Sequence, residues 1–168
     1  MNTKLSELAV EDSGDFKLEE FLPFQLAATT SRVSRMFAKR FAEELGLSIP
    51  EWRVLAVVGR FGTASPSMVS EWAAMDKVKV SRAAATLVAR GLLKQTQDPS
   101  DGRARLLRLT RKGTGVHHAA VPLARELEEN LASGLSRGDW GTLQRVLLRM
   151  SAHVESITGG ADGDEPEE

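Results

Sequence analysis

Residues 65–110 decide the fold, and they read SPSMVSEWAAMDKVKVSRAAATLVARGLLKQTQDPSDGRARLLRLT. A short helix is predicted to begin at Ser65, a favoured N-cap, with Pro66 at the first helical position. After a break at 75–76, a second helix is predicted to run to Gly91, with its basic residues clustered at the first turn. Two short helices joined by a tight turn, the second with a polar and basic start, are typical of a helix-turn-helix.

A β-hairpin is predicted directly after the second helix. The segments 92–97 and 103–109 have the lengths of short strands, and they flank the sequence DPSDG at 98–102, which is rich in turn-forming residues. Thr110 is then suited to cap a further helix. A helix-turn-helix followed at once by a hairpin is a winged arrangement.

Long amphipathic helices are predicted on both sides of this central part. Apolar side chains recur at helical spacing over 18–45, where Gly46 ends the helix, and a second helix is predicted over 50–61. After the hairpin, helical spacing continues to residue 134 and again from Ser136. No predicted sheet covers the first and last of these apolar stripes. We therefore expect them to cover one another, within the chain and across the two-fold axis of a dimer.

Charge is unevenly distributed along the chain, although its formal net charge is only −1. Residues 50–115 hold twelve basic and five acidic residues, which gives +7, whereas residues 1–20 carry −4 and the last eight residues, ADGDEPEE, carry −5. A basic centre between acidic ends is expected of a protein that binds a polyanion. The alternative is a basic solvated face without a partner.

Composition excludes several classes of site. The chain has no cysteine, which excludes disulfides, thiolate metal sites and thiol-based redox sensing, and which fits a cytoplasmic protein. No apolar run approaches the roughly 20 residues of a membrane span, and the N-terminus lacks the order of a signal peptide. His117 and His118 are adjacent, so on a helix they point about 100° apart, which does not suit a tetrahedral metal site. We expect no metal, no cofactor and no membrane partner.

The winged arrangement indicates how the basic centre meets DNA. The second helix of a helix-turn-helix suits the major groove, about 12 Å wide, while the hairpin tip reaches a neighbouring minor groove. A narrow minor groove concentrates negative potential and attracts an inserted arginine, and Arg103 stands at the tip. Asp101 is placed to hold its guanidinium, and Arg105 and Arg108 are assigned more loosely to phosphates.

The sequence MDKVKVSRAAATLVARGLLKQ at 75–95, followed by DPSDGRARLLRLT at 98–110, resembles the signature of the MarR family of winged-helix regulators. In that family an aspartate–arginine pair marks the wing and a Leu-Thr pair leads into a long dimerisation helix. The resemblance extends over about residues 20–157. It implies a homodimer on a pseudo-palindromic DNA operator, usually a repressor that a small ligand releases.

The resemblance also implies roles for single residues. Arg103 would enter the minor groove, with Asp101 as its brace. Lys79 stands where many relatives carry a small hydroxyl residue, which leaves the base preference at that position open. Contacts to bases and phosphates would come from the start of the second helix, namely Lys77, Lys79, Ser81 and Arg82.

An effector site is implied between the dimerisation helices and the winged domain, where relatives bind ligands. The segment 24–55 is similar to the branch that senses aromatic acids or their coenzyme A thioesters, which indicates a role in aromatic compound catabolism. The apolar residues of this region are otherwise ordinary core residues. The expected lining is Phe37, Trp52, Leu55, Phe61, Met68 and His117, with Arg32, Arg35 and Arg53 as partners of an anion.

The fold class predicted from the sequence is mainly α with a small β-hairpin wing, in a winged helix-turn-helix domain with N- and C-terminal dimerisation helices. The expected divisions are a flexible acidic N-terminus (1–17), the winged-helix domain (18–157, with dimerisation helices 18–45 and 111–157 and DNA-binding part 50–110), and a disordered acidic tail (158–168).

The predicted function is a homodimeric, sequence-specific DNA-binding transcriptional regulator. A rival class is a winged helix that binds protein without specific DNA binding, although such modules usually lose the basic wing. An enzyme is not predicted, since no catalytic Ser-His-Asp order, phosphate loop or paired acids are found, and the sequence from Ser136 to Asp139 is a helix cap. Repression and activation differ by operator position and stay open.

Overall fold

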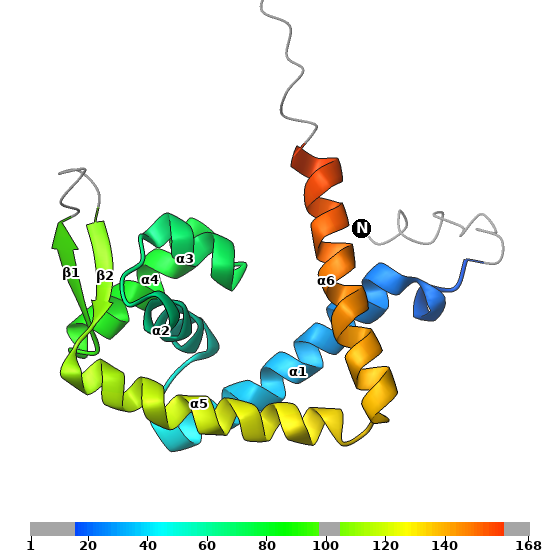
Figure 1. Ribbon diagram of the computed structural model, residues 1–168, viewed down its shortest axis with the longest axis horizontal. Coiled ribbons are helices and arrows are strands. Elements are labelled where there is room, and N and C mark those ends of the chain that lie inside the picture. Colours follow the sequence, from blue (N-terminus) through cyan, green and yellow to red (C-terminus); the bar gives the residue numbers. More distant parts are fainter. Residues whose placement is uncertain (1–15, 98–104, 160–168) are drawn as a thin grey trace, which may run out of the picture. The chain divides into compact units, whose positions relative to one another are not determined.

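The computed structural model describes residues 16–97 and 105–159 (Figure 1). The prediction of a mainly helical fold with one hairpin is confirmed. The chain divides into two compact units, which meet within one helix between Ala120 and Val121. The elements in chain order are the 3₁₀ turn η1 Leu18–Glu20, α1 Leu22–Leu45, α2 Ile49–Phe61, α3 Pro66–Ala73, α4 Lys77–Ala89, β1 Leu93–Gln97, β2 Arg105–Leu109, α5 Arg111–Ala132 and α6 Arg137–Gly159.

Local sequence signals fix several helix ends. Gly46 ends α1 in the left-handed conformation, with a φ of 60° that favours glycine. At the start of α3, the Oγ of Ser65 accepts a hydrogen bond from the backbone N–H of Met68 (3.1 Å). At the start of α5, the Oγ1 of Thr110 accepts one from the N–H of Gly113 (3.0 Å). These three ends confirm the sequence prediction.

The first helix begins later than its apolar spacing predicts. Residues Leu18–Glu20 form a 3₁₀ turn, Phe21 is extended, and α1 starts at Leu22. Pro23 lies in the first turn of α1, where its missing N–H would be unpaired in any case and where its fixed φ is already helical. The helix therefore starts at Leu22, directly before this proline, and not at residue 18.

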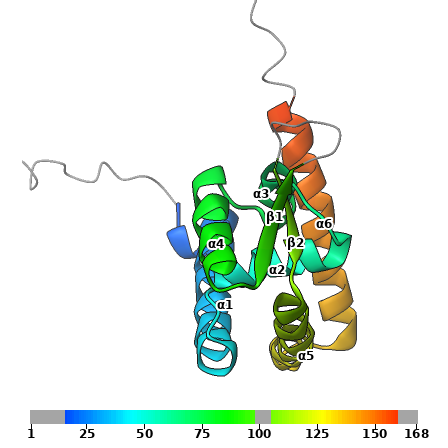
Figure 2. The same ribbon diagram turned by 90° about the vertical axis from the view of Figure 1, so that its left-hand side faces the viewer.

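Helix α2 lies at the centre of the first unit, and it contacts α1, α3, α4 and β2. Figures 1 and 2 show α2, α3 and α4 with the hairpin beside them. Burial of one large aliphatic side chain stabilises a fold by about 1.5–3 kcal/mol, so the fully buried residues hold this unit together. They are Phe41, Leu47, Val54, Leu55, Val58, Val69, Val80, Leu87, Leu92, Leu93 and Leu107.

The hairpin is joined to the helices through its backbone. Strands β1 and β2 pair antiparallel, with Leu93 opposite Leu109. Ala64, in the loop between α2 and α3, forms a further bridge to Leu107 of β2. The N–H of Ala64 donates to the carbonyl of Leu107 (3.1 Å), and the N–H of Leu107 donates to the carbonyl of Ala64 (2.8 Å). The wing is thereby fixed to the loop that leads into the helix-turn-helix.

The second unit contains α6 and the remainder of α5, which continues through Pro122. The Oγ of Ser136 accepts a hydrogen bond from the N–H of Asp139 (3.1 Å), which confirms the predicted cap. Helix α6 exposes a row of apolar side chains, namely Leu143, Val146, Leu147, Leu148, Val154 and Ile157. Within residues 16–97 and 105–159, no helix has the length and apolar character needed to cross a membrane.

Helix α5 begins very close to the backbone that precedes β1. The N–H of Thr110 donates to the carbonyl of Leu92 (3.0 Å), and its hydroxyl donates to the carbonyl of Gly91 (2.6 Å). A Cβ atom built on Gly113 would lie only 1.9 Å from the carbonyl oxygen of Leu92. Only glycine fits at this position, so Gly113 sets how closely α5 approaches the winged part.

Substitution Gly113→Ala is expected to lower the free energy of unfolding by about 1–3 kcal/mol, because the added methyl group forces α5 away from Leu92. Urea unfolding followed by circular dichroism measures this change. Gly115→Ala is the matched control, since nothing lies within 4 Å of a Cβ there. It should leave stability unchanged or raise it by up to about 1 kcal/mol through helix propensity. Equal losses in both variants would contradict the close-approach argument.

Candidate nucleic-acid interface

The outer side of α4 is basic at its first turn. Val80, Ala84 and Leu87 of this helix are buried in the core of the first unit. The four residues that the sequence predicted at the start of the recognition helix are exposed and lie within its first two turns, namely Lys77, Lys79, Ser81 and Arg82. The structure therefore brings this predicted set together on one accessible surface.

Val78 belongs to the same surface and was not predicted. Its side chain is 60% exposed, although it is a large apolar residue between two lysines. Apolar side chains in a major groove contact the methyl group of thymine, so Val78 suits base readout. The sequence could have indicated this exposed position, because helical spacing places Val78 outside the buried apolar stripe that begins at Val80.

Asp76 caps α4 and holds Lys79. Its carboxylate accepts a hydrogen bond from the N–H of Lys79 (2.8 Å) and forms an ion pair with the Nζ of Lys79 (3.1 Å). The backbone hydrogen bond, followed by the side-chain one, lowers the pKa of Asp76 below its ordinary value. Both side chains are exposed, and an exposed ion pair of this kind is weak. The ammonium of Lys79 is therefore free to exchange Asp76 for a DNA phosphate.

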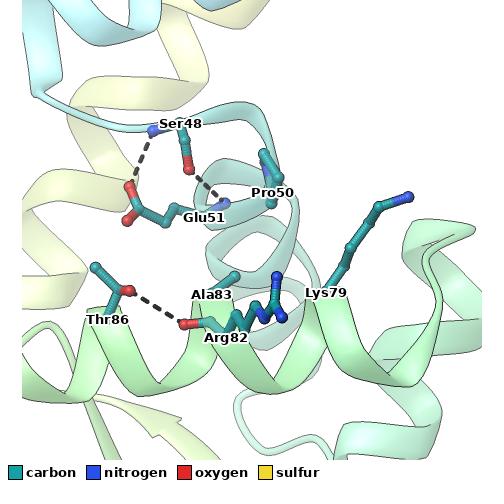
Figure 3. Close-up of a pocket in the computed structure, with 7 residues that line it drawn as sticks. All are labelled: Ser48, Pro50, Glu51, Lys79, Arg82, Ala83 and Thr86. Carbon is teal, nitrogen blue, oxygen red and sulfur yellow. Dashed lines mark hydrogen bonds between the residues drawn. The ribbon is translucent and has the colours of Figure 1, made fainter.

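A hollow of about 230 Å³ lies between the start of α2 and α4 (Figure 3). The N–H of Ser48 donates to Glu51 Oε2 (2.9 Å), and the N–H of Glu51 donates to Ser48 Oγ (3.4 Å), which caps α2. Glu51 is buried and pairs with Arg90 (3.2 Å). The guanidinium of Arg82, by contrast, has no hydrogen-bonding or ionic partner among the residues described. Arg82 is thus available to a phosphate at the rim of this hollow.

The predicted wing residues are only partly within the described chain. Asp101 and Arg103 lie outside the described residues. Arg105 is the first residue of β2 and is exposed. Arg108 is held differently, because its Nε donates a hydrogen bond to Thr63 Oγ1 (2.6 Å) in the loop between α2 and α3.

Three of the predicted effector residues lie in one aromatic row. The ring centroid of Phe37 is 6.2 Å from that of Phe41, which is 5.0 Å from Trp52, and the Trp52 ring is 6.2 Å from His117. Phe41 is fully buried and was not among the predicted lining residues. This row joins α1, α2 and α5, as the effector prediction required.

Other members of the predicted effector set lie elsewhere. Phe61 packs on Trp72, with ring centroids 5.0 Å apart, and the guanidinium of Arg60 lies over both rings. Phe61 follows Trp52 by nine residues, which places the two on opposite sides of α2 at about 100° per residue. The rest comprise buried Leu55, half-buried Met68 on α3, exposed Arg32 and Arg35 on α1, and Arg53, which donates to the carbonyl of Ala73 (3.4 Å).

His117 lies flat between α2 and α5. Its ring stacks on Trp52, and a Cβ on Gly59 would lie 2.3 Å from its Nε2, so a larger residue at position 59 would displace the ring. Burial, followed by the neighbouring charge of His118, lowers the pKa of His117 below its ordinary value of 6.5. His117 lines a separate hollow at the base of the wing, where Lys94 and Arg108 add positive charge. Among the described residues, no cluster of three or more metal-binding side chains is present.

Comparison with known proteins places this geometry among DNA-binding regulators. Residues 45–104 match the model of the MarR family. The chain is 26% identical over 145 residues to the HTH-type transcriptional repressor IacR of Pseudomonas putida, a match that covers 86% of each chain.

Solved structures agree with that match. BpsR of Bordetella bronchiseptica, whose DNA binding is regulated by 6-hydroxynicotinic acid, is 25% identical with a TM-score of 0.76, over 82% of this chain and 98% of its own. PcaV of Streptomyces coelicolor, solved with its natural ligand, shares the fold with a TM-score of 0.71 at 24% identity, over 84% of this chain and 99% of its own.

The environment of His117 predicts a pH dependence of stability. Below about pH 6.5 the unfolded chain takes up a proton at His117 that the folded chain resists, so the free energy of unfolding decreases as the pH falls from about 6.5 to the lowered pKa and levels off below it. Urea unfolding at a series of pH values measures this slope. His117→Gln should flatten it, whereas His153→Gln, at an exposed position on α6, should not. An unchanged slope in His117→Gln would refute this assignment.

Proposed function

The chain belongs to the MarR family, and on this premise we propose that it is a homodimeric transcriptional regulator that binds a specific DNA operator and responds to a small organic ligand. The observation that carries the proposal is the basic start of α4. Lys77, Lys79 and Arg82 lie there on the surface, and they are not needed by the core beneath them. Catalysis and a bound cofactor are not part of the proposal.

In the proposed complex, α4 enters the major groove. Val78 and Ser81 face base edges, and the basic residues of the same helix start bind bases and phosphates. Arg103, braced by Asp101, is proposed to enter the adjacent minor groove from the wing tip, and Arg105 to bind a phosphate beside it. These contacts combine sequence readout with the electrostatic attraction on which most DNA affinity depends.

A dimer is proposed because both ends of the described chain expose apolar side chains. The row on α6 is one such surface, and the start of the chain adds Phe16, Leu18, Phe21, Leu22 and Phe24. Contiguous apolar surface of this kind marks protein–protein interfaces. A two-fold dimer would set two copies of α4 about 34 Å apart, which is one turn of DNA, and would therefore read a pseudo-palindrome.

The proposed regulation is release of a repressor from its operator by an aromatic acid or its coenzyme A thioester, in the cytoplasm. IacR is named a repressor, and BpsR responds to an aromatic acid, 6-hydroxynicotinic acid. A ligand weakens DNA binding when it favours a conformation that binds DNA less well, and each 1.4 kcal/mol of that preference changes the equilibrium tenfold. The row formed by Phe37, Trp52 and His117 is proposed to border the effector site.

Arg82→Ala is expected to weaken operator binding roughly tenfold and to reduce the salt dependence of binding by about one phosphate contact. The reason is that its guanidinium has no partner among the described residues and is available to a phosphate. The measurement is a binding titration over a salt series, with DNA taken from immediately upstream of the protein's own coding region.

Arg125→Ala is the matched control, because it removes the same charge from an exposed site on α5 outside the winged part. It should leave affinity and salt dependence unchanged. If both variants bind like the parent protein, α4 is not the interface. If the parent protein shows no preference over random DNA, the rival proposal of a winged helix that binds protein takes precedence.

A further inference from the structure

A second hollow, of about 400 Å³, lies at the base of the wing. Its walls come from the end of α2, from both strands of the hairpin and from the first turns of α5, all within the first unit. Four of its lining residues are Lys94, Arg108, His117 and His118, and none of its lining residues is acidic. A concave site lined by basic and no acidic side chains is suited to an anionic ligand.

Two of these lining residues, Lys94 and Arg108, carry permanent positive charges and lie opposite each other on paired strands. Lys94 of β1 is the direct cross-strand partner of Arg108 of β2, so both side chains leave the same face of the hairpin. Like charges directly opposite one another destabilise a hairpin. The side-chain ammonium of Lys94 has no hydrogen-bonding or ionic partner among the residues that the structure describes. The hairpin therefore keeps an unfavourable pair of cations that an anion between them would stabilise.

The remainder of the hollow suits a flat organic group. His117 presents its imidazole ring, which is held on α2 above Gly59, and the ring of His118 lies 6.0 Å away. Val58 and Leu109 contribute apolar wall. Ligand sites of this kind combine apolar surface with a few fixed polar groups, and their volumes range from about 300 to 1,000 Å³. The hollow lies at the small end of that range.

We propose that this hollow binds a small planar organic acid, with its carboxylate between Lys94 and Arg108 and its ring against His117. The inference rests on the proposed function, because it assigns the site and the chemical class of the effector. A guanidinium and an ammonium together bind a carboxylate through charge-assisted hydrogen bonds. The size of the hollow favours a single-ring acid over its coenzyme A thioester.

Arg108 connects this site to the helix-turn-helix. Its Nε donates to Thr63 Oγ1 (2.6 Å). Thr63 is followed by Ala64, which forms the backbone bridge to Leu107, and by Ser65, which caps α3. A carboxylate is a stronger acceptor than a neutral hydroxyl, so a bound acid draws Arg108 away from Thr63. Binding thereby loosens one link between the wing and the helix-turn-helix.

The test is calorimetric titration of the full-length protein with benzoate, 4-hydroxybenzoate, 4-hydroxycinnamate and nicotinate at up to millimolar concentration. At least one acid should bind, and benzamide, which is planar and uncharged, should not. In Lys94→Gln and Arg108→Gln the dissociation constant of that acid should increase at least tenfold. Arg111→Gln is the matched control, since it removes a positive charge from an exposed position at the start of α5 outside the hollow, and it should bind the acid like the parent protein.

A variant that keeps every charge provides an independent check. Gly59→Ala should push the ring of His117 into the hollow and abolish acid binding, because the added methyl group overlaps the present position of the ring. Inorganic phosphate serves as a further probe of selectivity. If phosphate binds as tightly as the acids, the hollow is an unselective anion site and the planar-acid proposal is overturned.

Failure of this inference and failure of the proposed function can be told apart. If the protein binds its upstream DNA but none of the acids, or if Lys94→Gln binds the acid unchanged, the assignment of the hollow is wrong and the DNA-binding proposal stands. If an acid binds with the predicted dependence on Lys94 and no DNA is preferred, the site stands and the proposed function is wrong. Arg108→Gln should also make operator binding insensitive to the acid.

Discussion

The pair of backbone hydrogen bonds between Ala64 and Leu107 is the constraint on which the winged part depends. A two-stranded hairpin is marginally stable by itself, so this one depends on its attachment to the helices, to which the Arg108–Thr63 hydrogen bond and the buried side chain of Leu93 also contribute. The bridge fixes β2 against the loop that precedes α3, and Leu107 adds a fully buried side chain at the same place. The wing is thereby tied to the helix-turn-helix at a fixed point of its backbone.

Some charged side chains of the winged part form structural contacts, and others are exposed. Glu51 and Arg90, one buried and one half-buried, neutralise each other and also tie α4 to the end of α1, since Arg90 donates to the carbonyl of Gly46 (2.9 Å). Two further sets of exposed cations lie at the start of α4 and at the base of the wing. Neither set contributes to the core, and unpaired positive charge on a surface opposes folding slightly. Their presence is accounted for if both surfaces bind anions, a DNA phosphate at one and a carboxylate at the other.

Sequence predicted the parts of the fold that depend on local chemistry. The caps at Ser65 and Thr110 and the stop at Gly46 involve residues within a few positions of each other, and the structure confirms them. Contacts between distant segments were not predictable from local spacing. The bridge from Ala64 to Leu107, and the side of α2 on which Phe61 lies, follow from how helices and strands pack. The charged pair at the base of the wing depends on the register of the hairpin, which local spacing in the sequence does not determine.

The most direct test of the central claim, that a dimer reads DNA through two copies of α4, is hydroxyl-radical footprinting of the full chain on DNA upstream of its coding region. The account predicts two protected segments related by a dyad, with centres about 34 Å apart along the duplex. A single protected segment would contradict the dimer. Uniform coverage without a defined boundary would contradict sequence-specific reading by α4.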